Sequence, residues 1–177
     1  MELKPQDLFV VLKIVAARCK RPPYLQLATS LGLSLSETHA AVQRAEACHL
    51  LAGQDRDNRP NLAALQEFLL HGLKYVFPPE RGEFTRGVAT AYAAKPLSEK
   101  IAPGSDPIPV WPSPEGKDRG NAFSPLYKSA PAAAMRDPVL YEYLALTDAL
   151  RDGRPRERTL AAEELKRLLQ QAAETAL

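Results

Sequence analysis

The sequence has few of the features that mark secreted, zinc-stabilised or membrane proteins. Only two of its 177 residues are cysteines, Cys19 and Cys48, and their spacing fits neither a disulfide framework nor a zinc site. No apolar run approaches the roughly 20 residues of a membrane-spanning helix. The first residues include Glu2 and Asp7 and lack the basic region of a signal peptide. We therefore expect a protein of the reducing cytoplasm with no membrane partner.

Motifs of catalysis and nucleotide binding are also missing. The sequence contains no GxSxG nucleophile turn, no GxxxxGK[ST] phosphate-binding loop and no HExxH zinc motif. Its three histidines, His39, His49 and His71, are scattered without the spacing of metal ligands. We therefore expect that the protein is not an enzyme and that it uses neither a cofactor nor a metal ion.

An excess of charge of one sign is absent too. The chain has 23 Lys and Arg residues against 21 Asp and Glu residues, which gives a net charge of +2. Proteins that bind nucleic acid through charge alone are far more basic. This balance permits a nucleic-acid partner without predicting one, so a prediction of DNA binding has to come from particular residues.

The distribution of proline divides the chain into three zones. Eleven of the 16 prolines fall between residues 78 and 138. The zones 1–77 and 138–177 show the helical spacing of apolar residues instead. The zone 78–137 also contains dispersed aromatic residues, which disordered linkers generally lack. We predict a mainly α fold with an N-terminal domain over 1–77, a Pro-rich extended arm over 78–137 that packs on the helices or on a partner, and C-terminal helices over 138–177.

Residues 24–48 predict two helices joined by a tight turn. The first helix reaches Gly32, which is able to take the positive φ that ends many helices. Ser34 and Glu37 then form a capping box, in which each side chain satisfies a backbone N–H of the other residue, and this starts a second helix over 34–48. The polar tip GQDRDNRPN, residues 53–61, follows between two short apolar pieces and predicts a small β-hairpin.

This pair of helices and the hairpin resemble the winged helix-turn-helix of MarR-like bacterial transcription regulators. The resemblance covers residues 20–62, about a quarter of the chain. It implies that the helix over 34–48 enters the major groove of double-stranded DNA and that the hairpin, or wing, contacts the minor groove or the backbone. It further implies a dimeric repressor. Thr38 stands where such regulators usually have a larger aliphatic residue, and Glu37 would lie close to the phosphates.

The resemblance and the residue types together indicate eleven DNA-binding residues. They lie before and at the start of the first helix, on the outer face of the second and at the wing tip: Lys20, Arg21, Tyr24, Ser34, Ser36, His39, Gln43, Arg44, Arg56, Asn58 and Arg59. Gln43 suits adenine and Arg44 suits guanine, each worth ~1–3 kcal/mol of discrimination in a bidentate contact. The simpler interpretation of the same residues is a solvated helix face.

The C-terminal zone predicts how two chains associate. Leu160, Leu165, Leu168 and Leu169 form an apolar stripe on a helix that begins after Gly153. A lone terminal helix does not bury such a stripe, so we expect it to pair two chains in a homodimer.

Two other functions compete with a DNA-binding regulator. The first is a protein-interaction module, or an antitoxin-like autorepressor, that wraps a protein partner with its Pro-rich arm. The second is a regulator that responds to a small molecule held between the arm and the helices, near Arg86, Tyr92 and Trp111. The sequence does not identify an operator or an effector.

Overall fold

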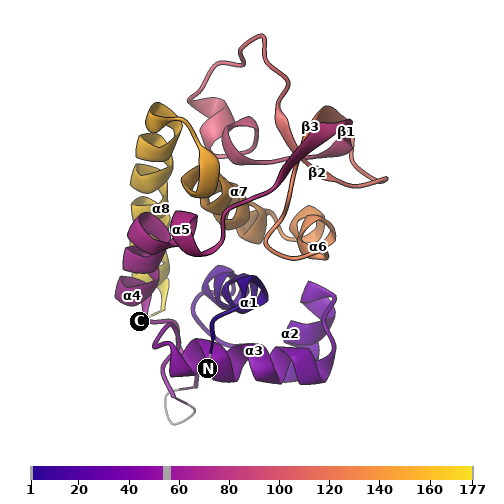
Figure 1. Ribbon diagram of the computed structural model, residues 1–177. Helices are drawn as coiled ribbons and strands as arrows, with labels where there is room; N and C mark the ends of the chain where they lie inside the picture. Colours follow the sequence, from indigo (N-terminus) through magenta and orange to yellow (C-terminus); the bar gives the residue numbers. More distant parts are fainter. Residues whose placement is uncertain (1, 54–56, 177) are drawn as a thin grey trace.

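A computed structural model describes residues 2–53 and 57–176, which fold mainly into helices with one small β-sheet (Figure 1). The prediction of a mainly α protein with a small β element is confirmed. The helices are α1 (Pro5–Ala16), α2 (Tyr24–Leu31), α3 (Leu35–Ala47), α4 (Leu62–Glu67), α5 (Leu73–Val76), α6 (Ala130–Arg136), α7 (Pro138–Asp152) and α8 (Pro155–Thr175). The strands are β1 (Arg81–Ala89), β2 (Pro109–Pro112) and β3 (Asp118–Phe123), and a π-helical turn, Phe68–Gly72, joins α4 to α5.

Local capping interactions define the ends of the helices. Gly32 ends α2 in the left-handed conformation, with φ of 65°. Ser34 caps α3: its hydroxyl accepts from the Glu37 backbone N–H at 3.1 Å, and the Glu37 carboxylate accepts from the Ser34 N–H at 2.8 Å. Asp137 caps α7 by accepting from the Leu140 N–H at 3.1 Å. The predicted helix ends at these positions are therefore confirmed.

One hydrophobic core extends through all three sequence zones. It includes fully buried side chains from each zone, such as Phe9, Trp111 and Leu165. Helix α1 is buried along most of its length and lies between the α2–α3 pair and α7 in Figure 1. The zones 1–77, 78–137 and 138–177 therefore share their packing, although their compositions differ.

The Pro-rich zone is a folded part of this core and not the extended arm that the sequence predicts. Strand β1 pairs antiparallel with both β2 and β3, while β2 and β3 pair in parallel, so the three strands close on one another. This closure needs glycine at two positions. A Cβ on Gly87 would overlap the carbonyl oxygen of Trp111, and one on Gly120 would overlap that of Ile108. Proline is tolerated because it stands at the ends of β2, Pro109 and Pro112.

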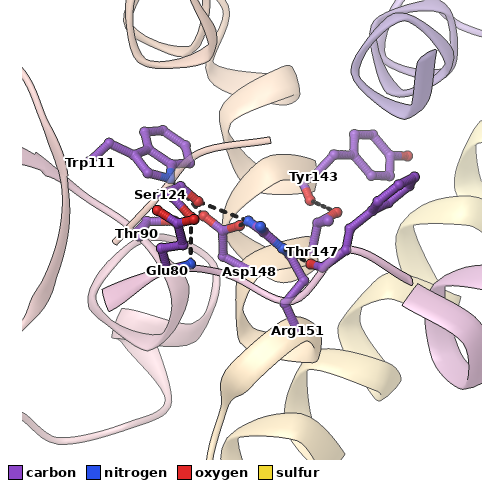
Figure 2. Close-up of polar contacts among 9 residues, drawn as sticks. Glu80, Thr90, Trp111, Ser124, Tyr143, Thr147, Asp148 and Arg151 are labelled. Carbon is purple, nitrogen blue, oxygen red and sulfur yellow. Dashed lines mark hydrogen bonds and ion pairs between the residues drawn. The ribbon is translucent and has the colours of Figure 1, made fainter. Parts of the chain in front are cut away.

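A buried polar network attaches the sheet to α7 (Figure 2). The Asp148 carboxylate accepts from the Thr90 hydroxyl and the Trp111 indole N–H, both at 2.7 Å, and from Arg151 at 2.8 Å. Because a buried charge is costly unless it is paired and hydrogen-bonded, these contacts fix where the sheet lies. Arg151 donates its other hydrogen bonds to backbone carbonyl oxygens, those of Phe77 at 2.8 Å and Ser124 at 3.0 Å.

The apolar stripe of α8 is covered within a single chain. Leu165 and Leu169 are buried, and Leu160 and Leu168 pack at the edge of the same core. Helix α8 contacts α7, α4 and α1. The expectation that a lone helix leaves this stripe free for a second chain is therefore wrong. None of the helices in the described part of the chain is long and apolar enough to cross a membrane.

Candidate nucleic-acid interface

Helix α3 presents one polar face to solvent and buries the other. Ser36, His39 and Gln43 are exposed, and their spacing of three and four residues places them on one side of the helix. The opposite side packs on α1 and α2. It includes Thr38, which is fully buried and whose hydroxyl donates to the Ser34 carbonyl oxygen at 2.9 Å. Thr38 therefore occupies the α2–α3 contact without an unsatisfied hydroxyl.

Three of the predicted residues come together in a stack beside this face. The Tyr24 ring at the start of α2 lies on the His39 ring, with centroids 3.6 Å apart and planes at 21°. The Arg21 guanidinium lies over the Tyr24 ring, 4.1 Å from its centroid. Cation–π contact of this kind holds a guanidinium in one place while leaving its edge free to donate. The stack therefore joins a cation to the exposed face of α3.

Hydrogen bonds position the Arg21 guanidinium further. Its Nε donates to the Asn58 side-chain oxygen at 3.1 Å, and its Nη1 donates to the Pro22 carbonyl oxygen at 3.1 Å. An arginine carries five N–H donors, so these two contacts leave donors for an anion. Lys20, next to it in the chain, is exposed. Both cations therefore lie beside α3, and their contacts with phosphates stay a prediction.

Arg44 does not belong to the exposed face, contrary to the prediction of a guanine contact. Its Nε and Nη2 donate to the two carboxylate oxygens of Asp7 at 2.8 and 2.6 Å. Asp7 is fully buried, and the Arg44 side chain is 14% exposed. Hydrogen bonding to Asp7 raises the pKa of Arg44. The guanidinium is therefore committed to joining α3 to α1, and reading a base would break this pair.

Asn58 is predicted as an exposed DNA contact at the wing tip, but it is a buried structural residue. It is fully buried and adopts a positive φ of 51°. Its amide nitrogen donates to the Glu46 carboxylate and to the Ala52 carbonyl oxygen, both at 3.3 Å. Asparagine tolerates this backbone conformation better than most residues, and here its side chain ties the turn to α3.

In the described part of the predicted hairpin over 50–62, an antiparallel bridge joins Leu51 and Pro60. The Ala52 N–H donates to the Arg59 carbonyl oxygen at 2.8 Å, which keeps the two sides of the turn together. Arg59 is exposed, as expected of a wing residue. Arg56, another predicted wing contact, lies outside the described residues.

Ser34 and Glu37 serve the start of α3. The Glu37 carboxylate accepts from the Ser34 N–H and from the Tyr127 hydroxyl, the latter at 3.2 Å. Hydrogen bonds from Ser34, and then that from Tyr127, lower the pKa of Glu37. Both side chains are therefore engaged in capping, and Glu37 links α3 to the segment that precedes α6. A DNA contact of Ser34, as predicted, would use the same hydroxyl that accepts from the Glu37 N–H in the cap.

Two other kinds of site can be compared with the structure, a metal site and the small-molecule site predicted near Arg86, Tyr92 and Trp111. In residues 2–53 and 57–176, no three His, Cys, Asp or Glu side chains are grouped to hold a metal ion. Trp111 is 1% exposed and donates to Asp148, so it is part of the core and does not line a pocket. Arg86 is exposed on β1.

No protein-family model, curated protein or solved structure matches this chain. The assignment of a function therefore rests on the chemistry of its own residues.

Proposed function

We propose that this protein binds double-stranded DNA through the exposed face of α3 and acts as a transcription regulator of the winged-helix type. The observation that carries the proposal is the stack of Arg21, Tyr24 and His39, which places a cation beside a capped helix with a polar outer face. A solvated helix face alone does not require an aromatic side chain to hold an arginine next to it.

The residues divide into those that position the protein on the duplex and those that read bases. Lys20, Arg21 and Arg59 supply cations for phosphates, which fix register and carry no sequence information. Gln43 and His39 face outward on α3 and suit base edges in the major groove. Asn58 supports this face by accepting a hydrogen bond from Arg21, and Arg44 supports it by pairing with Asp7 of α1.

We further propose that the regulator acts as a homodimeric repressor. Two copies of α3 would then read half-sites about one helical turn, ~34 Å, apart. The surface that pairs the chains is not the stripe of α8, because that stripe is buried in the monomer.

Selection from a random duplex library tests the proposal, since the operator is unidentified. Full-length protein is incubated with random duplexes, the bound fraction is sequenced, and the enriched duplex is titrated against a scrambled one at stated salt. We expect Gln43→Ala to weaken binding to the enriched duplex by about 1–3 kcal/mol while leaving the scrambled duplex unaffected. Lys20→Ala should weaken both and reduce the salt slope by about 1.

Gln170→Ala is the matched control, because Gln170 is an exposed glutamine on α8. Absence of any enriched duplex, or equal binding by the Gln43→Ala and Gln170→Ala variants, would overturn the proposal.

A further inference from the structure

The outer face of the β1–β3 pair, defined by Phe84, Arg86, Arg119 and Asn121, carries an unusual set of side chains. Arg86 lies directly opposite Arg119, and Phe84 lies directly opposite Asn121. Directly opposed residues of an antiparallel pair project from the same face of the sheet, close to one another. The four side chains therefore form one cluster. In Figure 1 the sheet and α3 lie at opposite ends of the molecule, so this cluster is separate from the α3 face.

The two arginines form a like-charge pair without a compensating acid among the described residues. Like charges directly opposite each other destabilise a strand pair. Asp118, the neighbour of Arg119, lies on the other face because successive residues of a strand alternate. By contrast, five other arginines of the described residues form ion pairs with a carboxylate: Arg44 with Asp7, Arg81 with Asp152, Arg151 with Asp148, Arg154 with Asp106 and Arg167 with Glu164. An anion bound between Arg86 and Arg119 would remove their repulsion.

Phe84 adds a flat apolar surface to this cluster. Phe84 is 55% exposed, although large aromatic residues are usually buried. The Arg119 guanidinium lies over one face of the Phe84 ring, 5.6 Å from its centre. The cluster thus presents a ring for stacking directly beside two donors for an anion.

The backbone behind the cluster is closely packed. Gly87 and Gly120 have no room for a Cβ, because the Trp111 and Ile108 carbonyl oxygens approach them closely. Gly87 follows Arg86 and Gly120 follows Arg119, so each strand is closely packed on its inner side at the position next to an arginine. The outer side chains therefore project from a fixed backbone, which lowers the entropic cost of binding.

We propose that this outer face binds single-stranded nucleic acid, with a phosphodiester between Arg86 and Arg119 and a base stacked on Phe84. Arginine matches the geometry of a phosphate, and an exposed base stacks on an aromatic ring. In a duplex the base faces are covered by their neighbours, so Phe84 selects an unpaired strand. An acidic peptide would satisfy the arginines and leave the ring without a partner. The proposal does not depend on the α3 face.

Fluorescence anisotropy of a labelled oligothymidylate tests this proposal with the full-length chain. An oligonucleotide of about 15 residues covers the site sizes that small single-strand-binding folds use. We expect Phe84→Leu to weaken binding by roughly tenfold, because the leucine keeps the apolar bulk and removes the ring. Arg119→Gln and Arg86→Gln should each weaken binding similarly and reduce its salt dependence.

Arg156→Gln is the matched control, since Arg156 is an exposed arginine on α8. Thermal melting separates binding from folding: Arg119→Gln should leave the melting temperature unchanged or raise it, because one of two repelling charges is removed. A tenfold loss with Phe84→Leu and Arg119→Gln but not with Arg156→Gln supports the proposal.

Any of four results would overturn it. The first three are no oligothymidylate binding, an equal loss with Arg156→Gln, and binding of polyglutamate in place of oligothymidylate through the same arginines. Loss of oligothymidylate binding with Gln43→Ala but not with Phe84→Leu would also overturn it, since the strand would then bind the α3 face. Each of these results leaves the duplex selection experiment, and hence the proposed regulator, to be judged separately.

Discussion

Gln43 and Arg44 are neighbours in the sequence with opposite positions in the structure. Gln43 is exposed on α3, whereas the Arg44 guanidinium forms a bidentate pair with the buried Asp7 of α1. Consecutive residues of a helix point about 100° apart, so only one of the two faces solvent. A polar residue on a short amphipathic helix is therefore not by itself a surface residue, and here the arginine holds two helices together.

Arg44→Ala should destabilise the protein strongly, because it leaves the Asp7 carboxylate buried without its cation. Removing one partner of a buried pair costs about 3–5 kcal/mol, whereas an exposed substitution such as Gln43→Ala usually changes stability by less than about 0.5 kcal/mol. Urea unfolding followed by circular dichroism measures both variants. Equal stability of the two would show that Arg44 does not support the core.

At the scale of elements, α7 is the helix that connects the rest of the fold. Its N-terminus is capped by Asp137, which also accepts from the Lys13 ammonium of α1 at 2.6 Å. Its C-terminal half carries Asp148 and Arg151, which hold the sheet. Through these contacts α7 fixes the position of α1 on one side and of the β1–β3 sheet on the other.

The Asp137 carboxylate should make stability depend on pH in the acid range. Burial raises the pKa of Asp137, but the hydrogen bonds from Lys13 and Leu140 outweigh it, so the pKa is lowered overall. A lowered pKa in the folded state stabilises the protein above the unfolded value, about 4, and this contribution is lost as pH falls through the folded value.

Asp137→Asn isolates the charge, because asparagine remains a good helix cap. At pH 7 the variant should be less stable than the wild type by on the order of 1 kcal/mol, the contribution of a charged hydrogen bond. The difference should shrink as the pH falls below 4. Asp137→Ala should lose about a further 1 kcal/mol through the cap. A difference between wild type and Asp137→Asn that does not vary with pH would contradict the role of the carboxylate.

At the scale of the whole molecule, zones of different composition share one core. Trp111 of β2 is buried against α7, and Leu165 of α8 belongs to the same cluster. A segment rich in proline therefore contributes side chains to the same core as the helices. Such a core predicts that sheet and helices lose their structure together.

Equilibrium unfolding in urea should show one transition for the entire chain. Trp111 is the single tryptophan, so its fluorescence reports on the sheet, while far-ultraviolet circular dichroism reports on the helices. The two probes should give coincident curves, as a two-state transition requires. An earlier midpoint for the fluorescence change would mean that residues 78–137 unfold separately from the helices.

Interactions within a few residues were predictable from the sequence. Gly32, the Ser34–Glu37 capping box and the Asp137–Pro138 start each act within one helical turn, so the ends of α2, α3 and α7 followed from local chemistry. The 3.6-residue period of α3 placed Ser36, His39 and Gln43 correctly on its outer face, whereas Arg44, predicted on the same face, is paired with Asp7.

Contacts between distant residues were decided only by the tertiary structure. The sheet depends on pairs such as Arg81 with Phe123, and short strands interrupted by proline give a weak local signal. The burial of Arg44 depends on Asp7, and that of Asn58 on Arg21 and Glu46. Helix ends reflect hydrogen bonds among neighbours in the chain, whereas sheet pairing and buried charges depend on partners that only the folded chain brings together.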